Sequence, residues 1–152
     1  MKNRIYLIIV MLSALLVSCA NLKERDHSSD ELEYVPEMIE IMNTHFANFN
    51  EEGYSFGGCV LEGKDIVCTL IVDESVLPAG KNLRQACQMV NVDEKAMSQM
   101  MKQKMYQEEL DEDEELGFKI LDKYNYRIII RIIGEPSGET MNCILDYASL
   151  LN

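Results

Sequence analysis

The chain has 152 residues, with 26 acidic and 14 basic side chains and a formal charge of −12 at pH 7. This length fits one domain with a buried core. The acidic balance disfavours binding to nucleic-acid phosphates, which such a surface repels, and it allows a cationic partner without implying one.

The first 18 residues have the layout of a secretory signal. Lys2 and Arg4 precede an uncharged run over residues 5–16. Since a membrane-spanning helix needs about 20 predominantly apolar residues, this run is too short to span a bilayer. We therefore expect residues 1–18 to be a signal peptide that is removed.

The run ends in Leu16-Val17-Ser18-Cys19, which resembles the lipobox of bacterial lipoproteins: an aliphatic residue, two smaller ones and a cysteine. The resemblance implies that the Cys19 sulfur takes a diacylglyceryl group, that a peptidase cuts after Ser18, and that the new amine receives a fatty acid such as palmitate. Cysteine suits this role because its sulfur is the nucleophile that forms the thioether. The alternatives are an ordinary signal peptide with a chance cysteine and an uncleaved anchor.

The residues that follow Cys19 bear on location. In lipoproteins of Gram-negative cells an aspartate after the cysteine tends to mean retention in the inner membrane, and here the residue is Ala20. The resemblance therefore favours the outer membrane. Residues 21–25 mix acidic and basic side chains. This favours the periplasmic face over the cell surface, where lipoproteins can carry an acidic cluster behind the cysteine.

The predicted mature chain is the lipidated Cys19 with a polar tether up to residue 33, followed by a single domain over residues 34–152. Removing residues 1–18 leaves 134 residues and takes away two basic side chains, so the formal charge becomes −14. Export to an oxidising compartment would let the cysteines of the domain pair as disulfides. These cysteines are Cys59, Cys68, Cys87 and Cys143.

The first half of the domain is predicted to hold a helix and a hairpin. Apolar residues recur at helical spacing over 35–49. Two β-rich runs follow at 56–62 and 65–73, and Gly63-Lys64 between them predicts a two-residue turn. This register places Cys59 opposite Cys68, near the range of a disulfide. The alternative is two small apolar residues on a core face, since a slip of one residue would separate the thiols.

The second half is predicted to repeat this order. Gln85 indicates a capping box at the start of a helix, and Asp93 indicates the cap of a second helical segment rich in methionine. Residues 117–123 and 126–133 predict a second hairpin, and residues 141–151 a last helix. The fold class is therefore α+β, with two helix-hairpin-helix units forming a four-stranded antiparallel sheet packed with about four helices. Equivalent places on two helices would make Cys87 and Cys143 candidates for a second disulfide.

The most suggestive group for chemistry is a set of methionines at helical spacing. Thioethers bind soft Cu(I), and this spacing stacks the sulfurs on one side of a helix. The other interpretation is core packing, because methionine is an ordinary filler of irregular cores. The set comprises Met97, Met100, Met101 and Met105.

No other group forms a catalytic constellation, so we expect no enzyme and no cofactor. His27 and His45 have no visible partner for acid, base or metal chemistry. Ser137 is expected to cap the last helix, and the acidic run at 111–115 lacks the pattern of an EF-hand loop. The interpretation we favour is a membrane-anchored envelope lipoprotein whose domain binds an unidentified envelope protein or ligand. A periplasmic Cu(I)-binding protein that uses the methionine helix is the alternative.

Overall fold

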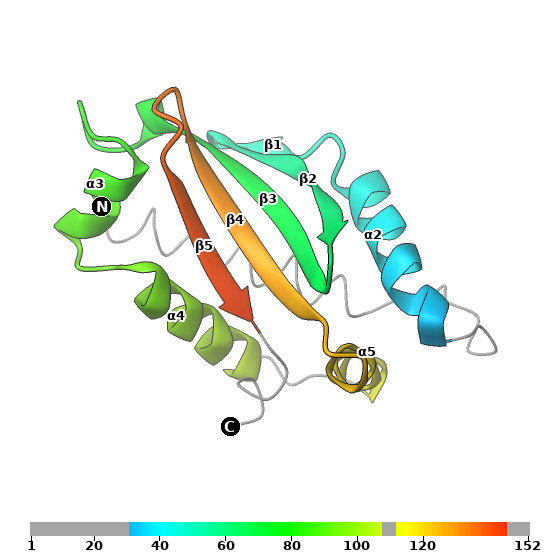
Figure 1. Ribbon diagram of the computed structural model, residues 1–152. Coiled ribbons are helices and arrows are strands. Elements are labelled where there is room, and N and C mark those ends of the chain that lie inside the picture. The colour runs from blue at the N-terminus through cyan, green and yellow to red at the C-terminus, as the bar shows by residue number, and fades with distance from the viewer. Residues whose placement is uncertain (1–30, 108–111, 146–152) are drawn as a thin grey trace.

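The computed structural model describes residues 31–107 and 112–145, which form an α+β domain with a five-stranded sheet (Figure 1). The strands are β1 (Asn50–Glu51), β2 (Tyr54–Glu62), β3 (Asp65–Asp73), β4 (Arg127–Glu135) and β5 (Thr140–Leu145). The α-helices are α2 (Tyr34–His45), α3 (Leu83–Met89), α4 (Glu94–Gln107) and α5 (Glu112–Lys123). Two short 3-10 turns, η1 (Glu31–Glu33) and η2 (Glu74–Val76), precede α2 and follow β3.

The sheet is mixed, in the order β1-β2-β3-β4-β5. Neighbouring strands run antiparallel except β3 and β4, which pair in parallel from Asp65↔Arg127 to Asp73↔Glu135. Two parallel strands cannot be joined by a tight turn. The chain therefore passes through α3, α4 and α5 before it returns as β4.

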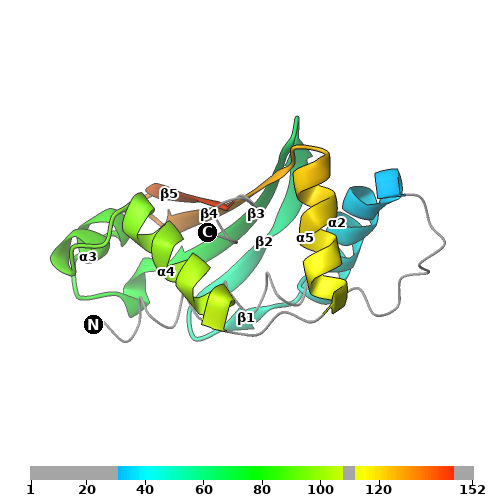
Figure 2. The ribbon, with the colours of Figure 1, turned by 90° about the horizontal axis from the view of Figure 1, so that it is seen from below.

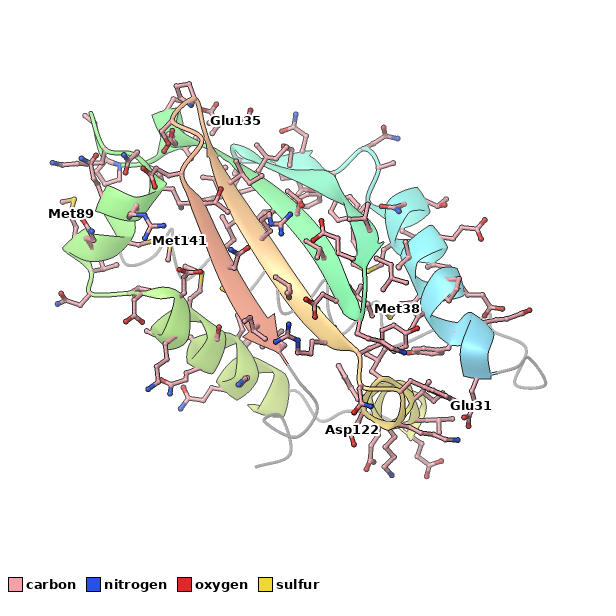
Figure 3. The ribbon with its side chains drawn as sticks, viewed as in Figure 1. Glu31, Met38, Met89, Asp122, Glu135 and Met141 are labelled. Atoms are coloured by element: carbon pink, nitrogen blue, oxygen red, sulfur yellow. The ribbon has the colours of Figure 1, made fainter. Side chains whose placement is uncertain are left out.

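The helices cover one face of the sheet. Side chains alternate between the two faces of a strand, and the buried positions of β3 and β4 follow this period. On the covered face they are Ile66, Cys68, Leu70, Val72, Ile128, Ile130 and Ile132. Figure 2 shows α3 and α4 flanking the sheet at one end and α2 and α5 at the other. Figure 3 labels Met38 on α2 and Met141 on β5, both of which are buried in this core.

The first hairpin confirms the predicted register. Cys59 pairs with Cys68, and Glu62 pairs with Asp65 across the turn. Gly63 has a φ of 64°, a conformation that costs glycine little and suits a two-residue hairpin turn. Farther from the turn the register shifts between Phe56 and Gly58, so Gly57 occupies a β-bulge.

The predicted caps are confirmed as well. The Asn82 side chain accepts a hydrogen bond from the Gln85 amide at 2.9 Å, and the Gln85 side chain accepts one from the Asn82 amide at 3.1 Å. Asp93 accepts from the Ala96 amide at 2.7 Å, at the start of α4. These bonds satisfy amide groups that the first turn of a helix leaves unpaired.

The strand predicted at residues 117–123 is wrong, because this segment belongs to α5. Phe118, Ile120 and Leu121 are its buried apolar residues, and this spacing forms a helical stripe. Acidic residues at the helix start interact favourably with the helix dipole. The Lys119 ammonium also lies 3.2 Å from the Glu115 carboxylate, one helical turn away.

The helix predicted at residues 141–151 is wrong over the part that the structure describes. Residues 140–145 form β5, where Met141, Cys143 and Leu145 are buried and alternate with more exposed residues. Residues 146–151 of the predicted helix lie outside the described residues. The second hairpin therefore joins β4 to β5 through a turn at residues 136–139, about ten residues later than the sequence indicated.

The proposed sheet is corrected in two respects. It has five strands in place of four, and it is mixed in place of antiparallel. The expected repeat does not hold in the form predicted. Residues 117–123, which were expected to be the first strand of the second unit, are part of helix α5. The structure keeps the helix-hairpin order in both halves, as α2 before β2 and β3, and α5 before β4 and β5.

Residues 31–33, which the sequence assigned to the tether, form η1 and contact the domain. The Glu31 carboxylate lies 2.7 Å from the Lys123 ammonium and 3.1 Å from the Tyr124 hydroxyl, and Figure 3 labels it beside the end of α5 near Asp122. Within residues 31–107 and 112–145, none of the helices combines the length and apolar character needed to cross a bilayer.

The capping box at α3 gives a direct test of local stability. Replacing Asn82 by alanine leaves the Gln85 amide without its acceptor, so we expect the free energy of unfolding to fall by about 1 kcal/mol. Urea unfolding of the chain without its signal peptide measures the change. Asn82→Asp keeps the acceptor and should stay within about 0.5 kcal/mol of the parent. Equal losses in both variants would contradict the role of the cap.

Candidate functional site

The face of the sheet opposite the helices is the candidate binding surface. We call it the open face, because no described helix crosses it in Figure 1. Val60, Val67, Ile129 and Ile144 are successive cross-strand partners, so they form one row over four strands. We call this line of β-branched residues the apolar row. Its outer members, Val60 and Ile144, are 53% and 42% exposed.

Charged pairs lie on both sides of the apolar row. The Arg127 guanidinium contacts the Asp65 carboxylate through two bonds of 2.9 and 3.0 Å. From the other side of the row, Arg131 reaches across it to Glu62, at 3.6 Å. Arg131 is level with Thr69 and Glu62 with Asp65, so this pair spans the position of Val67. An arginine stem covers apolar surface well, which accounts for Val67 being only 1% exposed although it faces away from the helices.

A second apolar pair lies farther along the open face. Ile71 and Ile133 are direct partners and are half-buried. Beyond them, Asp73 and Glu135 pair at the end of the parallel strands, and Figure 3 shows Glu135 at the turn that leads to β5. The far end of the open face therefore carries two acidic residues, whereas the region around the apolar row has two acidic and two basic residues.

The free edge of the sheet at β5 is partly covered by side chains. The Glu94 carboxylate accepts a hydrogen bond from the backbone N–H of Asn142 at 2.7 Å. Arg84 donates to the Thr140 carbonyl at 2.9 Å and pairs with Glu139 at 3.0 Å. Because outward-pointing backbone groups of an edge strand are templates for another strand, these contacts hinder pairing with a second chain along β5.

A buried carboxylate joins three separate segments of the chain. Glu74, at the end of β3, is only 8% exposed. Its carboxylate accepts hydrogen bonds from the Leu83 amide at 2.6 Å, from the Ser137 amide at 2.7 Å and from the Ser137 hydroxyl at 2.7 Å. It therefore fastens the first turn of α3 and the β4–β5 turn to the end of β3.

The protonation of Glu74 follows from these contacts. Burial works to raise the pKa of the carboxyl, but the bonds from Ser137 and Leu83 outweigh burial and hold the pKa below its ordinary value. Gly134 provides the space, since a Cβ there would lie 2.6 Å from the Glu74 Oε2 atom. Three donors around an ionised carboxylate are typical of a structural role.

Sequence reasoning missed this cluster and misassigned Ser137. No helix follows Ser137, because the chain continues as β5, and its amide and hydroxyl serve Glu74. One signal was present in the sequence. Gly134 interrupts an isoleucine-rich strand, and a glycine inside a strand often marks the close approach of another group.

Three sulfur atoms meet under the first hairpin. The Cys59 and Cys68 sulfurs are 3.1 Å apart, and the Met42 sulfur lies 3.8 Å from that of Cys68. The side chain of Asn43 holds the strand to α2 by bonding the Cys59 carbonyl and amide at 2.8 and 2.7 Å. The hydrogen bond from Cys68 lowers the pKa of Cys59, and burial opposes it in part. All four described cysteines are buried thiols, so the disulfide stays a prediction.

The second pair of thiols has a different environment. Burial raises the pKa of Cys87 to about 11, with a small opposing effect of Arg84. Burial also raises the pKa of Cys143 to about 12, and the charges of Glu94 and Cys87 add to the rise. Since the thiolate is the reactive form, both groups should be inert at neutral pH.

The methionine set is divided between core and surface. Met97 and Met101 are fully buried in the core, and Met100 is half-buried and packs against it. The side chain of Met105 lies outside the described part of α4. Burial of the first two sulfurs among apolar residues favours core packing.

The remaining candidates do not come together. His45 is exposed at the end of α2, and His27 lies outside the described residues. The described part of the acidic run, from residue 112, lies at the start of α5. Over residues 31–107 and 112–145, histidine, cysteine, aspartate and glutamate form no group of three that could hold a metal ion.

Comparisons with known proteins give no match. No model of a protein family fits the chain, and neither the curated proteins nor the solved structures contain a significant relative.

Removal of the buried charge should weaken the fold and change its pH dependence. A hydrogen bond to a charged group contributes about 1.5–3 kcal/mol, so we expect Glu74→Gln to lower the free energy of unfolding by about 2–4 kcal/mol. Because the folded pKa is lowered, this contribution is present above the ordinary glutamate pKa of about 4.3 and is lost as the pH falls through the folded value. When the free energy of unfolding is measured by urea unfolding between pH 7 and pH 3, it should fall less steeply with decreasing pH in the variant than in the parent.

Glu139→Gln is the matched control, because Glu139 lies in the β4–β5 turn close to Ser137, but its side chain is 38% exposed and pairs with Arg84 at the surface. Its loss should cost less than about 1 kcal/mol. If the two variants lose equal stability, or if Glu74→Gln keeps the full acid sensitivity, the role given to Glu74 is wrong.

The two thiol pairs should differ in chemical state. In the chain isolated from an oxidising compartment, we expect peptide mapping without reduction to find Cys59 linked to Cys68, because their register and contact allow it. Cys87 and Cys143 should be alkylated slowly until the chain is unfolded. Cys68→Ser should leave Cys59 as a thiol. Two unlinked thiols at residues 59 and 68 would support the alternative of plain core packing.

Proposed function

We propose that this chain is a lipid-anchored lipoprotein of the bacterial envelope whose domain is a non-enzymatic binding module. The segment Leu16-Val17-Ser18-Cys19 after a short uncharged run supports the anchor. Two or three acyl chains hold a protein durably, because each buried CH₂ contributes about 0.8 kcal/mol. Location at the periplasmic face of the outer membrane is part of the proposal and rests on Ala20 and the mixed charges behind it.

The open face supports the binding role. Its apolar row presents two well-exposed β-branched side chains on a rigid sheet. These two side chains lie on β2 and β5, and the Arg131–Glu62 pair covers Val67 between them. The tether, which starts at Cys19, would let the domain stand clear of the headgroups, since a loose coil of about 13 residues reaches roughly 20 Å.

Metabolic labelling tests the anchor. The full chain is produced in a Gram-negative bacterium supplied with an alkyne analogue of palmitate. We expect the wild type to carry the label and to fractionate with the outer membrane. Cys19→Ser should lose the label and accumulate with its signal peptide, because the sulfur that receives the lipid is gone.

Cys59→Ser is the matched control, since it removes a buried thiol that comes 40 residues after Cys19 in the sequence, and it should keep the label. An unlabelled wild-type chain, or a mature chain released into the medium, would overturn the proposed anchor.

A further inference from the structure

We propose that the three sulfur atoms under the first hairpin form a binding site for one Cu(I) ion. We call them the sulfur cluster, which consists of the thiols of Cys59 and Cys68 and the thioether of Met42. The Cys68 sulfur contacts both others, at 3.1 Å from that of Cys59 and 3.8 Å from that of Met42. The cluster belongs to the core on the covered side of the sheet. The inference therefore goes beyond the binding role proposed for the open face and does not depend on it.

Three elements of the fold bring the sulfurs together. Cys59 on β2 and Cys68 on β3 are direct partners in the register of the hairpin. Met42 comes from α2, and the next residue, Asn43, fastens this turn of the helix to β2. The Asn43 side chain does so through two hydrogen bonds to the Cys59 backbone, of 2.8 and 2.7 Å. The backbone around the cluster is therefore held in place before an ion binds, which favours a precise site.

The kind of donor selects the metal. Thiolates and thioethers are soft ligands that favour Cu(I). A structural zinc site takes four ligands, mostly from cysteine and histidine. In the part of the chain that the structure describes, no histidine or carboxylate joins the two thiols in a group of three that could hold a metal. The Met42 thioether distinguishes the cluster from a simple cysteine pair, because a disulfide makes no use of a third sulfur and a soft metal ion does.

Burial keeps water from competing as a ligand. The exposed fractions of Cys59, Cys68 and Met42 are 1%, 5% and 2%. On binding, Cu(I) replaces the protons of the two thiols, which pass to solvent, and all three sulfurs donate a lone pair to the ion. Copper stays Cu(I), so no electron is transferred. The hydrogen bond from Cys68 lowers the pKa of Cys59, which helps the first proton to leave.

The packing has to open slightly to admit the ion. With metal–sulfur bonds of about 2.3 Å, the value for zinc thiolates, three sulfurs around one ion lie about 4 Å apart. The contact between Met42 and Cys68 already has nearly this length, whereas the two thiols must separate by about 1 Å. Rotation of the thiols about their Cα–Cβ bonds provides this shift while the backbone stays in place. The disulfide expected above is the state of the same thiols in the chain without metal, and a bound ion would block it.

Titration with Cu(I) tests the inference. The chain without its signal peptide is kept reduced under nitrogen, and it carries Cys19→Ser so that the sulfur of the lipobox adds no ligand. Cu(I) is supplied as its complex with bicinchoninate, a competing chelator. We expect the chain to take one Cu(I) with a sub-nanomolar Kd, and X-ray absorption to find three sulfur neighbours around the copper. No binding tighter than micromolar would overturn the inference.

Met42→Leu and Met38→Leu form a matched pair of variants. Both residues are methionines of α2 that are 2% exposed, Met38 is labelled in Figure 3, and leucine has a similar volume. Met42→Leu should weaken Cu(I) binding more than about tenfold, since even the loss of a residue behind the ligands costs that much. It should also leave two sulfur neighbours. Met38→Leu should keep the affinity and all three neighbours, and equal effects of the two variants would contradict the site.

Paired cysteine variants separate the two pairs of thiols. Cys59→Ser with Cys68→Ser should abolish tight binding of Cu(I). Cys87→Ser with Cys143→Ser removes the other two buried thiols and should keep it. If the second pair of variants loses the copper, the ion lies elsewhere and the inference is wrong.

The methionine helix α4 provides the last control. Met97→Leu with Met101→Leu removes two buried thioethers and should leave the binding of Cu(I) unchanged. Loss of binding in this variant would move the site to α4 and overturn the assignment to the sulfur cluster. Fatty-acid labelling of Cys19 reports separately on the anchor, so its failure is distinguishable from these results.

Discussion

The parallel pairing of β3 with β4 is the constraint on which the other features depend. Antiparallel neighbours need only short turns, but this pair requires the chain to cross from one end of the sheet to the other. The crossover carries α3, α4 and α5, and together with α2 these helices cover one face. Among the described elements only strands form the opposite face, and the candidate binding surface lies there. Glu74 secures the end of this pair by holding the start of the crossover and the β4–β5 turn.

The sequence predicts structure well where the determinants are local. The register of the first hairpin follows from the Gly63-Lys64 turn, and the caps at Asn82 and Asp93 follow from side chains within three residues of their partners. In each case the two groups that interact are close along the chain, so turn chemistry and spacing are sufficient.

The errors arise where distant residues decide the outcome. Residues 117–123 have the composition of a strand or a helix, and packing of Phe118 and Leu121 into the core selects the helix. Residues 140–145 have apolar residues at spacings that fit either a helix or a strand. Pairing with the open edge of β4 selects the strand. Parallel pairing of β3 with β4 and the burial of Glu74 depend on contacts across about 60 residues, which no window of sequence contains. For the candidate site, the sequence predicted a strand over residues 126–133, but not the neighbouring strands that place Ile129 in a row with Val67 and Ile144.

The interior position of β4 in the sheet affects when the domain can fold. A strand from the last quarter of the chain lies inside the sheet, between β3 and β5, so β3 lacks one of its two neighbours until residue 135 has been added. An N-terminal fragment can form its hairpin but cannot close the core, and such long-range contacts are slow to form. For a chain exported as proposed above, this order would be favourable, because the core cannot close until the last strands have crossed the membrane.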